Sequence, residues 1–478
     1  MPHSLTGRQR WWALMVLCLG VLMIVLDTTI VNVALPSIKA DLGFNEASLV
    51  WVINAYMLTF GGFLLLGGRL GDLLGHRRVF LAGLTLFTLA SAACGLAHGQ
   101  ATLVAARAAQ GLGGAVVSAV SLSLIMTLFT EASDRARAMG VYGFVCAGGG
   151  SLGVLLGGLL TSTLSWHWIF LVNLPLGLIV FLLCLWLLPA GGGHRPSGAL
   201  DVAGAITVTL SLMLAVYAVV NANEAGWVSA QSLTLLLLAA ALMVGFLRIE
   251  ARAGSPLMPL SLFTLRNVAT ANGVGVLWAA SMFAWFFLSA LYMQAVLGYT
   301  PMQVGLAFLP ANLIMAAFSL GGSARLVMRF GIRPPLAAGL ALAALGLAWF
   351  ARAPVDGDFV LDVLPGMVAL GVGAGIALNP ILLAAMSDVD PADAGLASGV
   401  VNTAFMMGGA LGLAVLASLA GGHSARQLAA GAQPLAALTS GYALSFAAGA
   451  ASAGLAALAA AVFLRRGRHS SSPLGDPS

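Results

Sequence analysis

The sequence predicts an all-α integral membrane protein with fourteen transmembrane helices, arranged as two six-helix bundles with two further helices between them. The first observation is composition: 60% of the 478 residues are hydrophobic and only 8% are charged, whereas a soluble domain carries about 25% charged residues. Mean hydropathy is +1.00. The second observation is a series of apolar stretches long enough to cross a bilayer, and the third is a repeat that links the two halves of the chain.

The apolar stretches follow one another with short polar or glycine-rich connections. A spanning helix needs roughly 20 apolar residues, because each residue adds 1.5 Å to a path of about 30 Å. The first six helices are expected near residues 11–34, 47–67, 79–97, 101–128, 138–163 and 168–188. Two inserted helices are expected near 200–220 and 231–248, between flexible linkers at 189–198 and 251–256 that are rich in Gly, Pro and Ser. The last six are expected near 268–293, 303–328, 334–351, 360–386, 396–420 and 440–464.

The cationic residues give the orientation of these helices, because cytoplasmic loops are enriched in Lys and Arg. Of the 21 Lys and Arg residues, all except Lys39, Arg107, Arg352 and Arg426 fall in loops on one side of the membrane. A single missed or added helix would scramble this sorting. We therefore expect fourteen spans with both termini in the cytoplasm.

Two separated sequence echoes indicate an internal duplication. Arg69, Leu70, Gly75 and Arg77 recur 256 residues later as Arg325, Leu326, Gly331 and Arg333, although Asp72 falls opposite Met328. At an offset of 259, Asp134, Ala138, Gly140, Val141, Gly149, Gly150, Leu152 and Gly153 match Asp393, Ala397, Gly399, Val400, Gly408, Gly409, Leu411 and Gly412. Both displacements equal eight helices rather than six. This predicts a first bundle at 1–190, a linker with two inserted helices at 191–262, a second bundle at 263–464 and a cytoplasmic tail at 465–478, an architecture typical of transporters.

Charge and cysteine usage exclude several other classes. The net charge of +5 is attributed to cytoplasmic loops that meet anionic lipid head groups, so no nucleic-acid partner is expected. Cys18, Cys94, Cys146 and Cys184 all fall within expected helices without metal-ligand spacing, and they are interpreted as packing residues. The chain has no phosphate-binding loop and no catalytic His or Cys cluster. We expect neither an ATP-driven protein nor an enzyme, and no metal.

Four motifs carry a family resemblance, and a fifth segment at 165–177 supports it. The motifs lie at 26–36 in the first helix, 68–78 between the second and third, 107–113 in the fourth, and 149–158 in the fifth. With these motifs the chain resembles the fourteen-helix drug:proton antiporter branch of the major facilitator superfamily over nearly its whole length. The resemblance implies the major facilitator fold. One position departs from the family pattern, which has proline where this chain has Val154, so the helix lacks the kink that proline imposes.

Asp27 is the expected proton carrier. A carboxylate at the centre of a spanning helix costs about 2.5–3.5 kcal/mol on insertion scales, and such residues are rarely kept without a function. The alternative is a cap or interface residue that faces water near the outer end. Arg107 lies at a similar depth, roughly 10 Å below the outer face at 1.5 Å per residue, which permits an ion pair that protonation of Asp27 would break. The alternative for Arg107 is an arginine that snorkels to the outer head groups.

The resemblance assigns two further sets of residues. It implies a cytoplasmic gate, formed by Gly68, Arg69, Gly71, Asp72, Gly75, Arg77 and Arg78, that latches the two bundles together. Ordinary cytoplasmic charge is the alternative, and Met328 opposite Asp72 implies a one-sided latch. The resemblance also implies an antiporter motif containing Gly149, Gly153, Gly157 and Gly158. Small residues of this kind let helix backbones approach closely.

Candidate substrate contacts lie in the second bundle. The aromatic and methionine residues are Trp278, Met282, Phe283 and Tyr292, and the polar residues are Gln294, Asn312, Asn379 and Asn402. Aromatic and methionine surfaces adapt to varied apolar ligands. The same residues could instead face lipid or pack the bundle, and the polar ones could join neighbouring helices.

The resemblance implies a proton-coupled antiporter that exports hydrophobic, drug- or antibiotic-like compounds by alternating access. It would act as a monomer in the bacterial cytoplasmic membrane, driven by the proton gradient without a cofactor, with the substrate, protons and membrane lipid as its partners. One alternative is a dedicated exporter of a single metabolite, lipid or siderophore. A membrane enzyme or receptor is the other, but the chain lacks the catalytic cluster or soluble domain that it would need.

Overall fold

A computed structural model describes residues 7–129, 131–188, 201–254, 256–389 and 394–465, and the described chain is helical. The first part contains α1 Gly7–Leu42, α2 Glu46–Leu49, α3 Trp51–Leu74, α4 His76–Gly95, α5 Gln100–Leu128, α6 Ala132–Thr163, α7 Trp168–Leu171, α8 Asn173–Leu187, α9 Val202–Ala225 and α10 Ala230–Arg252. The second part contains η1 Leu260–Thr264, α11 Arg266–Leu291, η2 Tyr292–Val296, α12 Pro301–Ala317, η3 Phe318–Gly322, α13 Ser323–Phe330, α14 Arg333–Phe350, η4 Phe359–Val363, α15 Leu364–Met386, α16 Ala394–Ala429 and α17 Pro434–Phe463.

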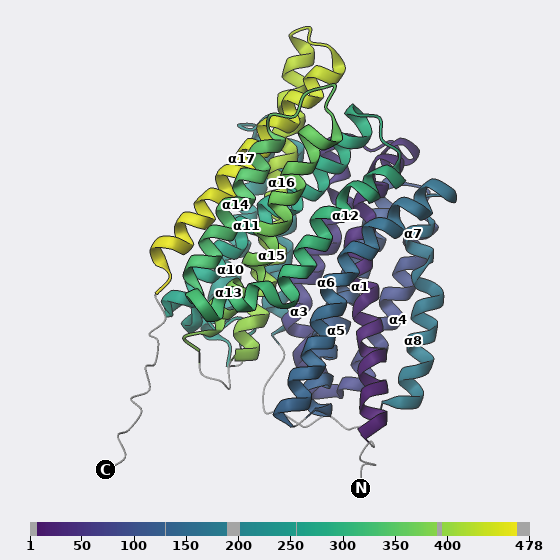
Figure 1. Cartoon of the computed structure of the whole chain (residues 1–478), viewed down its shortest axis with the longest axis vertical. Helices are drawn as coiled ribbons and strands as arrows, with labels where there is room; N and C mark the ends of the chain where they lie inside the picture. Colours follow the sequence, from purple (N-terminus) through teal and green to yellow (C-terminus); the bar gives the residue numbers. More distant parts are fainter. Residues whose placement is uncertain (1–6, 130, 189–200, 255, 390–393, 466–478) are drawn as a thin grey trace.

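Thirteen helices in the described residues are long and apolar enough to cross a membrane. The shorter helix α12 continues through the π-helical turn η3 into α13, so this stretch supplies one more span. The fourteen expected spans are therefore confirmed. The beginning of α1 and the end of α17 lie at the same, lower end of the molecule (Figure 1).

Several predicted helix boundaries were wrong, and the largest differences lie at the ends of the first and thirteenth spans. The first helix was expected to end at residue 34, but α1 continues through Pro36 to Leu42. Leu35 and Ile38 are fully buried, so packing carries the helix past the proline. The amide of Gln100 then donates to the Leu42 carbonyl at 3.1 Å, which satisfies an end carbonyl. At the other boundary, the thirteenth span was expected to end at residue 420, but α16 ends at Ala429.

The helices form two groups, with α1–α8 on one side and α11–α17 on the other (Figure 1). Helix α6 packs against α12, and α3 packs against α16, so these four helices join the groups. The inserted helices α9 and α10 pack against each other, and α9 also contacts α3 and α16.

The two groups repeat the same local geometry, as the sequence echoes predicted. Gly75 turns from α3 into α4 with φ +94°, and Gly331 turns from α13 into α14 with φ +78°. In the second echo, a Cβ on Gly153 of α6 would meet Leu26 of α1, and a Cβ on Gly412 of α16 would meet Ala280 of α11. Thus α6 packs on α1 as α16 packs on α11. Asp393, the partner of Asp134 in this echo, lies outside the described residues.

Hydrogen bonds join the two groups near the end opposite the described termini. The Gln294 amide beyond α11 donates to the Val33 carbonyl of α1 at 2.9 Å. The Tyr442 hydroxyl of α17 lies 3.1 Å from Oε1 of Glu46 in α2, and Lys39 of α1 lies 3.2 Å from the same oxygen. This end of the molecule is closed by contacts between the groups.

Candidate functional site

A buried ion pair joins α1 to α5. The Asp27 side chain has no exposed surface, and that of Arg107 is 1% exposed. Nη1 of Arg107 donates to Oδ2 of Asp27 at 2.5 Å, and Nε donates to the Val52 carbonyl of α3 at 2.8 Å. The structure brings together the two residues that the sequence placed at a common depth. Because the guanidinium is held among three helices, it does not extend to the protein surface as a snorkelling arginine would.

Three polar side chains complete a network around Asp27. Gln110, one turn after Arg107, donates to Oδ1 of Asp27 at 2.6 Å and accepts from Nη1 of Arg107 at 2.7 Å. Asn173 at the start of α8 donates to the same Oδ1 at 3.3 Å. Ser91 of α4 accepts from the Gln110 and Asn173 amides at 3.1 and 3.0 Å. Four helices of the first group therefore converge on one carboxylate.

Sequence reasoning did not identify these three polar residues as part of the site. Gln110 lies in the motif at 107–113 and Asn173 in the segment at 165–177, so motif membership was an available signal for both. Ser91 lies in no motif. Its role follows only from the packing of α4 beside α5 and α8.

Aromatic rings cover the guanidinium. Its Cζ lies 4.4 Å from the centroid of Tyr56 and 5.6 Å from that of Phe170, within the range of cation–π attraction. With three N–H donors on its two oxygens, Asp27 is satisfied as an ionised carboxylate, and buried charges require such pairing. A proton on Oδ2 would remove the charge attraction to Arg107, which would keep its bonds to Val52 and Gln110.

The antiporter-motif glycines line two faces of α6. Gly149, Gly153 and Gly157 face α1, where a Cβ on Gly153 would lie 2.9 Å from the Leu26 carbonyl oxygen. A Cβ on Gly157 would lie 2.6 Å from the Ile30 carbonyl oxygen, again too close. Gly158 faces α12 instead. Helix α6 therefore lies between the turn that carries Asp27 and the second group of helices.

Helix α6 runs unbroken past the position where the resembled family has proline. Val154 is fully buried inside this helix. A Cβ on Gly305 of α12 would lie 3.0 Å from the Val154 carbonyl oxygen, so the two helices approach closely at this point.

The expected gate residues lie mostly in a helix rather than in the loop that the sequence suggested. Gly68, Arg69, Gly71 and Asp72 all belong to α3, which continues to Leu74 instead of ending at 67. Gly75 alone forms the turn, and Arg77 and Arg78 lie in the first turn of α4. The glycine explains the abrupt change of direction, because its positive φ is accessible without strain.

Among the described residues, the side-chain hydrogen bonds and the ion pair of the gate residues remain within the first group of helices and the segment after α10. Nε2 of His76 lies 3.1 Å from Oδ1 of Asp72, one turn away. Arg77 donates to the Leu185 carbonyl of α8 at 2.6 Å, and Arg69 donates to the Pro256 carbonyl at 3.4 Å. Asp72 is half exposed and therefore accessible for a different partner.

The candidate substrate residues do not form one cluster. Trp278 is fully buried in α11, and Tyr292 is also buried, with its hydroxyl donating to the Pro354 carbonyl at 2.6 Å. Asn379 donates to the Ser319 carbonyl at 3.0 Å. Trp278 therefore packs in the core, and the other two side chains form hydrogen bonds to neighbouring segments.

Three other candidates occupy more varied positions. Asn402 is exposed and donates to the carbonyl one turn before it. Asn312 of α12 is 2% exposed, and its Nδ2 has no hydrogen-bond partner in the described part of the chain. Met282 is partly buried in α11.

Phe283 lies where α3, α11 and α16 meet. A Cβ on Gly409 of α16 would lie 2.5 Å from the Phe283 ring and 2.9 Å from Cε of Met57 in α3. The Phe283 and Phe405 ring centroids are 5.9 Å apart. Asn54 of α3 donates to the Ala410 carbonyl at 2.9 Å, while its Oδ1 is buried and has no partner within the described segments. Apolar, adaptable side chains and one unused acceptor thus meet at the junction of the two groups.

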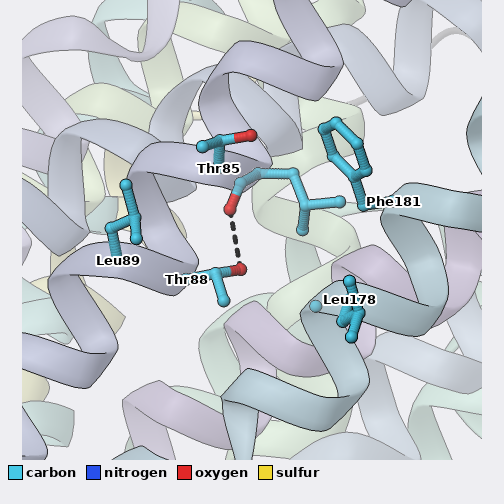
Figure 2. A pocket seen from close by; sticks show the side chains of 7 residues that line it. Thr85, Thr88, Leu89, Leu178 and Phe181 are labelled. Carbon is cyan, nitrogen blue, oxygen red and sulfur yellow. Dashed lines mark hydrogen bonds between the residues drawn. The ribbon is translucent and has the colours of Figure 1, made fainter.

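A separate groove lies between α4 and α8 (Figure 2). Leu89 and Leu178 on its rim are exposed, and Phe181 closes one side. The Thr88 hydroxyl donates to the Leu84 carbonyl of its own helix at 2.8 Å, as the dashed line in Figure 2 shows. None of the candidate substrate residues lines this groove.

Comparisons with known proteins agree with this geometry. The sequence profile of the Major Facilitator Superfamily matches residues 17–413. The chain is 43% identical to the cephamycin export protein of Amycolatopsis lactamdurans over 86% of this chain and 85% of that protein. It is 40% identical to the puromycin resistance protein of Streptomyces alboniger, over 88% and 84% of the two chains. It is 37% identical to a multidrug resistance protein of Mycobacterium tuberculosis, over 86% and 76%.

Solved transporter structures share the fold. A nucleoside transporter superimposes with a TM-score of 0.65 at 14% identity, over 94% of this chain and 99% of that one. The xylose transporter of E. coli superimposes with a TM-score of 0.64 at 14% identity, over 96% and 99%. The arrangement of helices is therefore preserved where the sequences have diverged.

Proposed function

The chain belongs to the major facilitator superfamily, and from this premise we propose that it exports hydrophobic, antibiotic-like compounds across the bacterial cytoplasmic membrane in exchange for protons. Family membership makes it a multi-pass membrane transporter rather than an enzyme. Export is supported by relatives of 37–43% identity that are named for antibiotic export, antibiotic resistance or multidrug resistance.

Proton coupling is supported by one observation, the buried Asp27–Arg107 pair. Protonation would neutralise Asp27 and weaken its hold on Arg107, which has other acceptors in Val52 and Gln110. A carboxylate that exchanges an ionic partner for a proton has two stable bonding states, which is what coupling requires. The protein needs no cofactor in this scheme, because the proton gradient supplies the free energy.

The antiporter-motif helix offers a path from the proton site to the bundle junction. Gly153 and Gly157 hold α6 against the turn around Asp27, and Gly158 holds the same helix against α12. A change in α1 after protonation would therefore be passed to the contact between the two groups. We propose that the substrate binds at the junction that contains Met57, Phe283 and Phe405, and that the groups rock about it.

The test is drug transport into proteoliposomes driven by an imposed pH gradient. We expect Asp27→Asn to abolish gradient-driven transport while expression and membrane insertion remain near wild type. Asp356→Asn is the matched control, because it makes the same chemical change on an exposed loop residue. Undiminished transport by Asp27→Asn would remove Asp27 from the coupling role.

The breadth of substrates separates the main proposal from a dedicated exporter. Two relatives carry the name of a single antibiotic, whereas the third is named for multidrug resistance. Transport assays with a panel of chemically unrelated hydrophobic drugs distinguish these alternatives. Activity on several of them supports a multidrug exporter, and activity on one compound class only identifies a dedicated exporter.

A further inference from the structure

Two carboxyl groups face each other at the base of the inserted helices, far along the chain from Asp27. Asp201 precedes the first turn of α9, where its Oδ1 accepts from the Gly204 N–H at 2.7 Å. Glu250 lies in the last turn of α10 and is 3% exposed, and its Oε2 accepts from the Met258 N–H at 3.1 Å. The two side chains approach each other beside Gly204.

The oxygens that face each other have no donor. Oδ2 of Asp201 and Oε1 of Glu250 are both buried and lack any hydrogen-bond partner among the described residues. They flank the same point, because a Cβ on Gly204 would lie 2.5 Å from the first and 3.0 Å from the second. Buried polar atoms in proteins are normally paired, so these two oxygens need a donor that both can share.

We propose that Asp201 and Glu250 form a second proton-binding site, in which one proton is shared between Oδ2 and Oε1. Two adjacent ionised carboxylates repel each other, and a pair in this position holds a proton in preference to two charges. One shared proton also supplies the single donor that both orphan oxygens lack. Gly204 makes the approach possible, since any larger side chain there would separate the two groups.

The charged groups nearby do not replace the proton. Arg248 and Arg252 lie on α10 itself, and Arg69 reaches from α3 to the Pro256 carbonyl. In the described part of the chain, none of these arginines donates to either carboxyl group. Among the described residues, Asp201 is therefore the titratable side chain that faces Glu250 directly.

The shared proton holds a short segment, residues 256–258, which we term the strap. Glu250 binds the strap through the Met258 N–H, and Arg69 of the gate motif binds it through the Pro256 carbonyl. Leu257 packs against Leu66 of α3 and Ala205 of α9. The strap leads directly into η1 and α11, so it connects α3 and the inserted helices to the second group.

Loss of the proton releases the strap. With both carboxylates ionised, repulsion moves Glu250 away from Asp201, and the bond to the Met258 N–H is lost with it. A change of proton occupancy in the inserted helices thereby alters the contact between the strap and α3, the helix that carries most of the gate motif. This site is separate from the Asp27 network, and the inference stands whether or not Asp27 couples transport.

Infrared difference spectroscopy of the purified full-length protein tests proton occupancy. We expect the carbonyl band of a protonated carboxylic acid to disappear as the pH is raised, and to be absent at every pH in Glu250→Gln. The band should persist in Asp27→Asn and in Glu224→Gln, the matched control at the opposite end of α9. A band that is unchanged in Glu250→Gln would overturn the assignment.

Hydrogen exchange of the Met258 amide tests the link to the strap. In wild type, protection corrected for intrinsic exchange should fall about tenfold as the pH is raised, the loss expected for one hydrogen bond to a charged group. Glu250→Gln supplies a permanent donor to Asp201, so protection should remain high at all pH values, whereas Glu250→Ala should remove it at all pH values. Protection that is independent of pH in wild type would refute the strap mechanism. Protection that follows sodium concentration at constant pH would instead identify a cation site and overturn the proton assignment.

Discussion

At the scale of single residues, Asp27 is defined by its donors rather than by its position in a motif. Arg107, Gln110 and Asn173 all donate to its two oxygens, and Ser91 orients both amides. A buried ion pair of this kind contributes little net stability, because desolvation offsets the attraction. Separating the two partners is nevertheless costly, so the protonation state of the Asp27 carboxylate affects how the surrounding helices pack.

Removing either member of the Asp27–Arg107 pair should lower the free energy of unfolding. Removing both should lower it by less than the sum of the two single effects. We expect Arg107→Ala to destabilise the protein by roughly 3–5 kcal/mol, since it leaves Asp27 buried without its cation. Combining Arg107→Ala with Asp27→Asn should recover about 2 kcal/mol through the coupling term of the cycle. Unfolding in mixed micelles measures these free energies. Additive effects would show that the two charges do not depend on each other.

At the scale of elements, glycines determine which helices can meet. The three glycines of α6 that face α1 have no room for a Cβ, whereas Gly150 of the same motif has nothing within 4 Å of the corresponding position. The motif therefore contains both packing glycines and at least one that the contacts do not require. This difference provides a control within a single helix.

We expect Gly153→Ala to reduce transport strongly and to lower thermal stability, because the new methyl group would overlap the Leu26 backbone. Gly150→Ala should be neutral or stabilising by up to about 1 kcal/mol, since Ala favours the helix over Gly. Thermal unfolding and proteoliposome transport of the two variants give the comparison. Equal effects of the two substitutions would mean that helix propensity, not the α1–α6 approach, explains the motif.

The gate motif should affect turnover rather than binding. Asp72 lies sixteen residues after Tyr56 in the same helix, so about 24 Å of α3 separates it from the residue that covers Arg107. We expect Asp72→Asn to slow turnover while drug affinity, measured by fluorescence quenching, stays within a few-fold of wild type. Glu131→Gln is the control for an exposed acid before α6. A large loss of affinity in Asp72→Asn would show that the gate shapes the binding pocket.

At the scale of the whole molecule, the two groups of helices are joined by a small number of polar contacts at one end. Glu46 accepts from Lys39 in its own group and from Tyr442 in the other group. Gln294 reaches Val33 across the same boundary. Because a few hydrogen bonds can be exchanged at modest cost, this closure is compatible with a transporter that alternates between two states.

Tyr442→Phe should shift the molecule toward a state that is open at this end. The variant loses only the hydroxyl bond to Glu46, and a bond to a charged group is worth enough to change the populations by about tenfold. Spin labels at the exposed residues Leu164 and Leu435 report the opening as a longer distance population. Tyr217→Phe, on the exposed face of α9, should leave the distribution unchanged. An unaltered distribution in Tyr442→Phe would show that Glu46 does not control closure.

The sequence by itself determined the fourteen spans, the repeat and the common depth of Asp27 and Arg107. These properties depend on hydropathy, on matching residues in the two halves and on rise per residue, all of which can be counted along one chain. Hydropathy could not place the end of α1, because packing of Leu35 and Ile38 against neighbouring helices carries it past Pro36. Hydropathy also ended the second span at residue 67, so the gate motif was expected to be a loop, although most of it continues α3.

Only the tertiary structure decided which side chains share a partner. Ser91 has no sequence signal, yet it orients the two amides that bind Asp27. Asp201 and Glu250 lie in different helices, and neither stood out until both were found to share one buried space beside Gly204. The physical reason is that burial and hydrogen-bond satisfaction are properties of the space between helices, and that space is created by packing rather than by the order of residues.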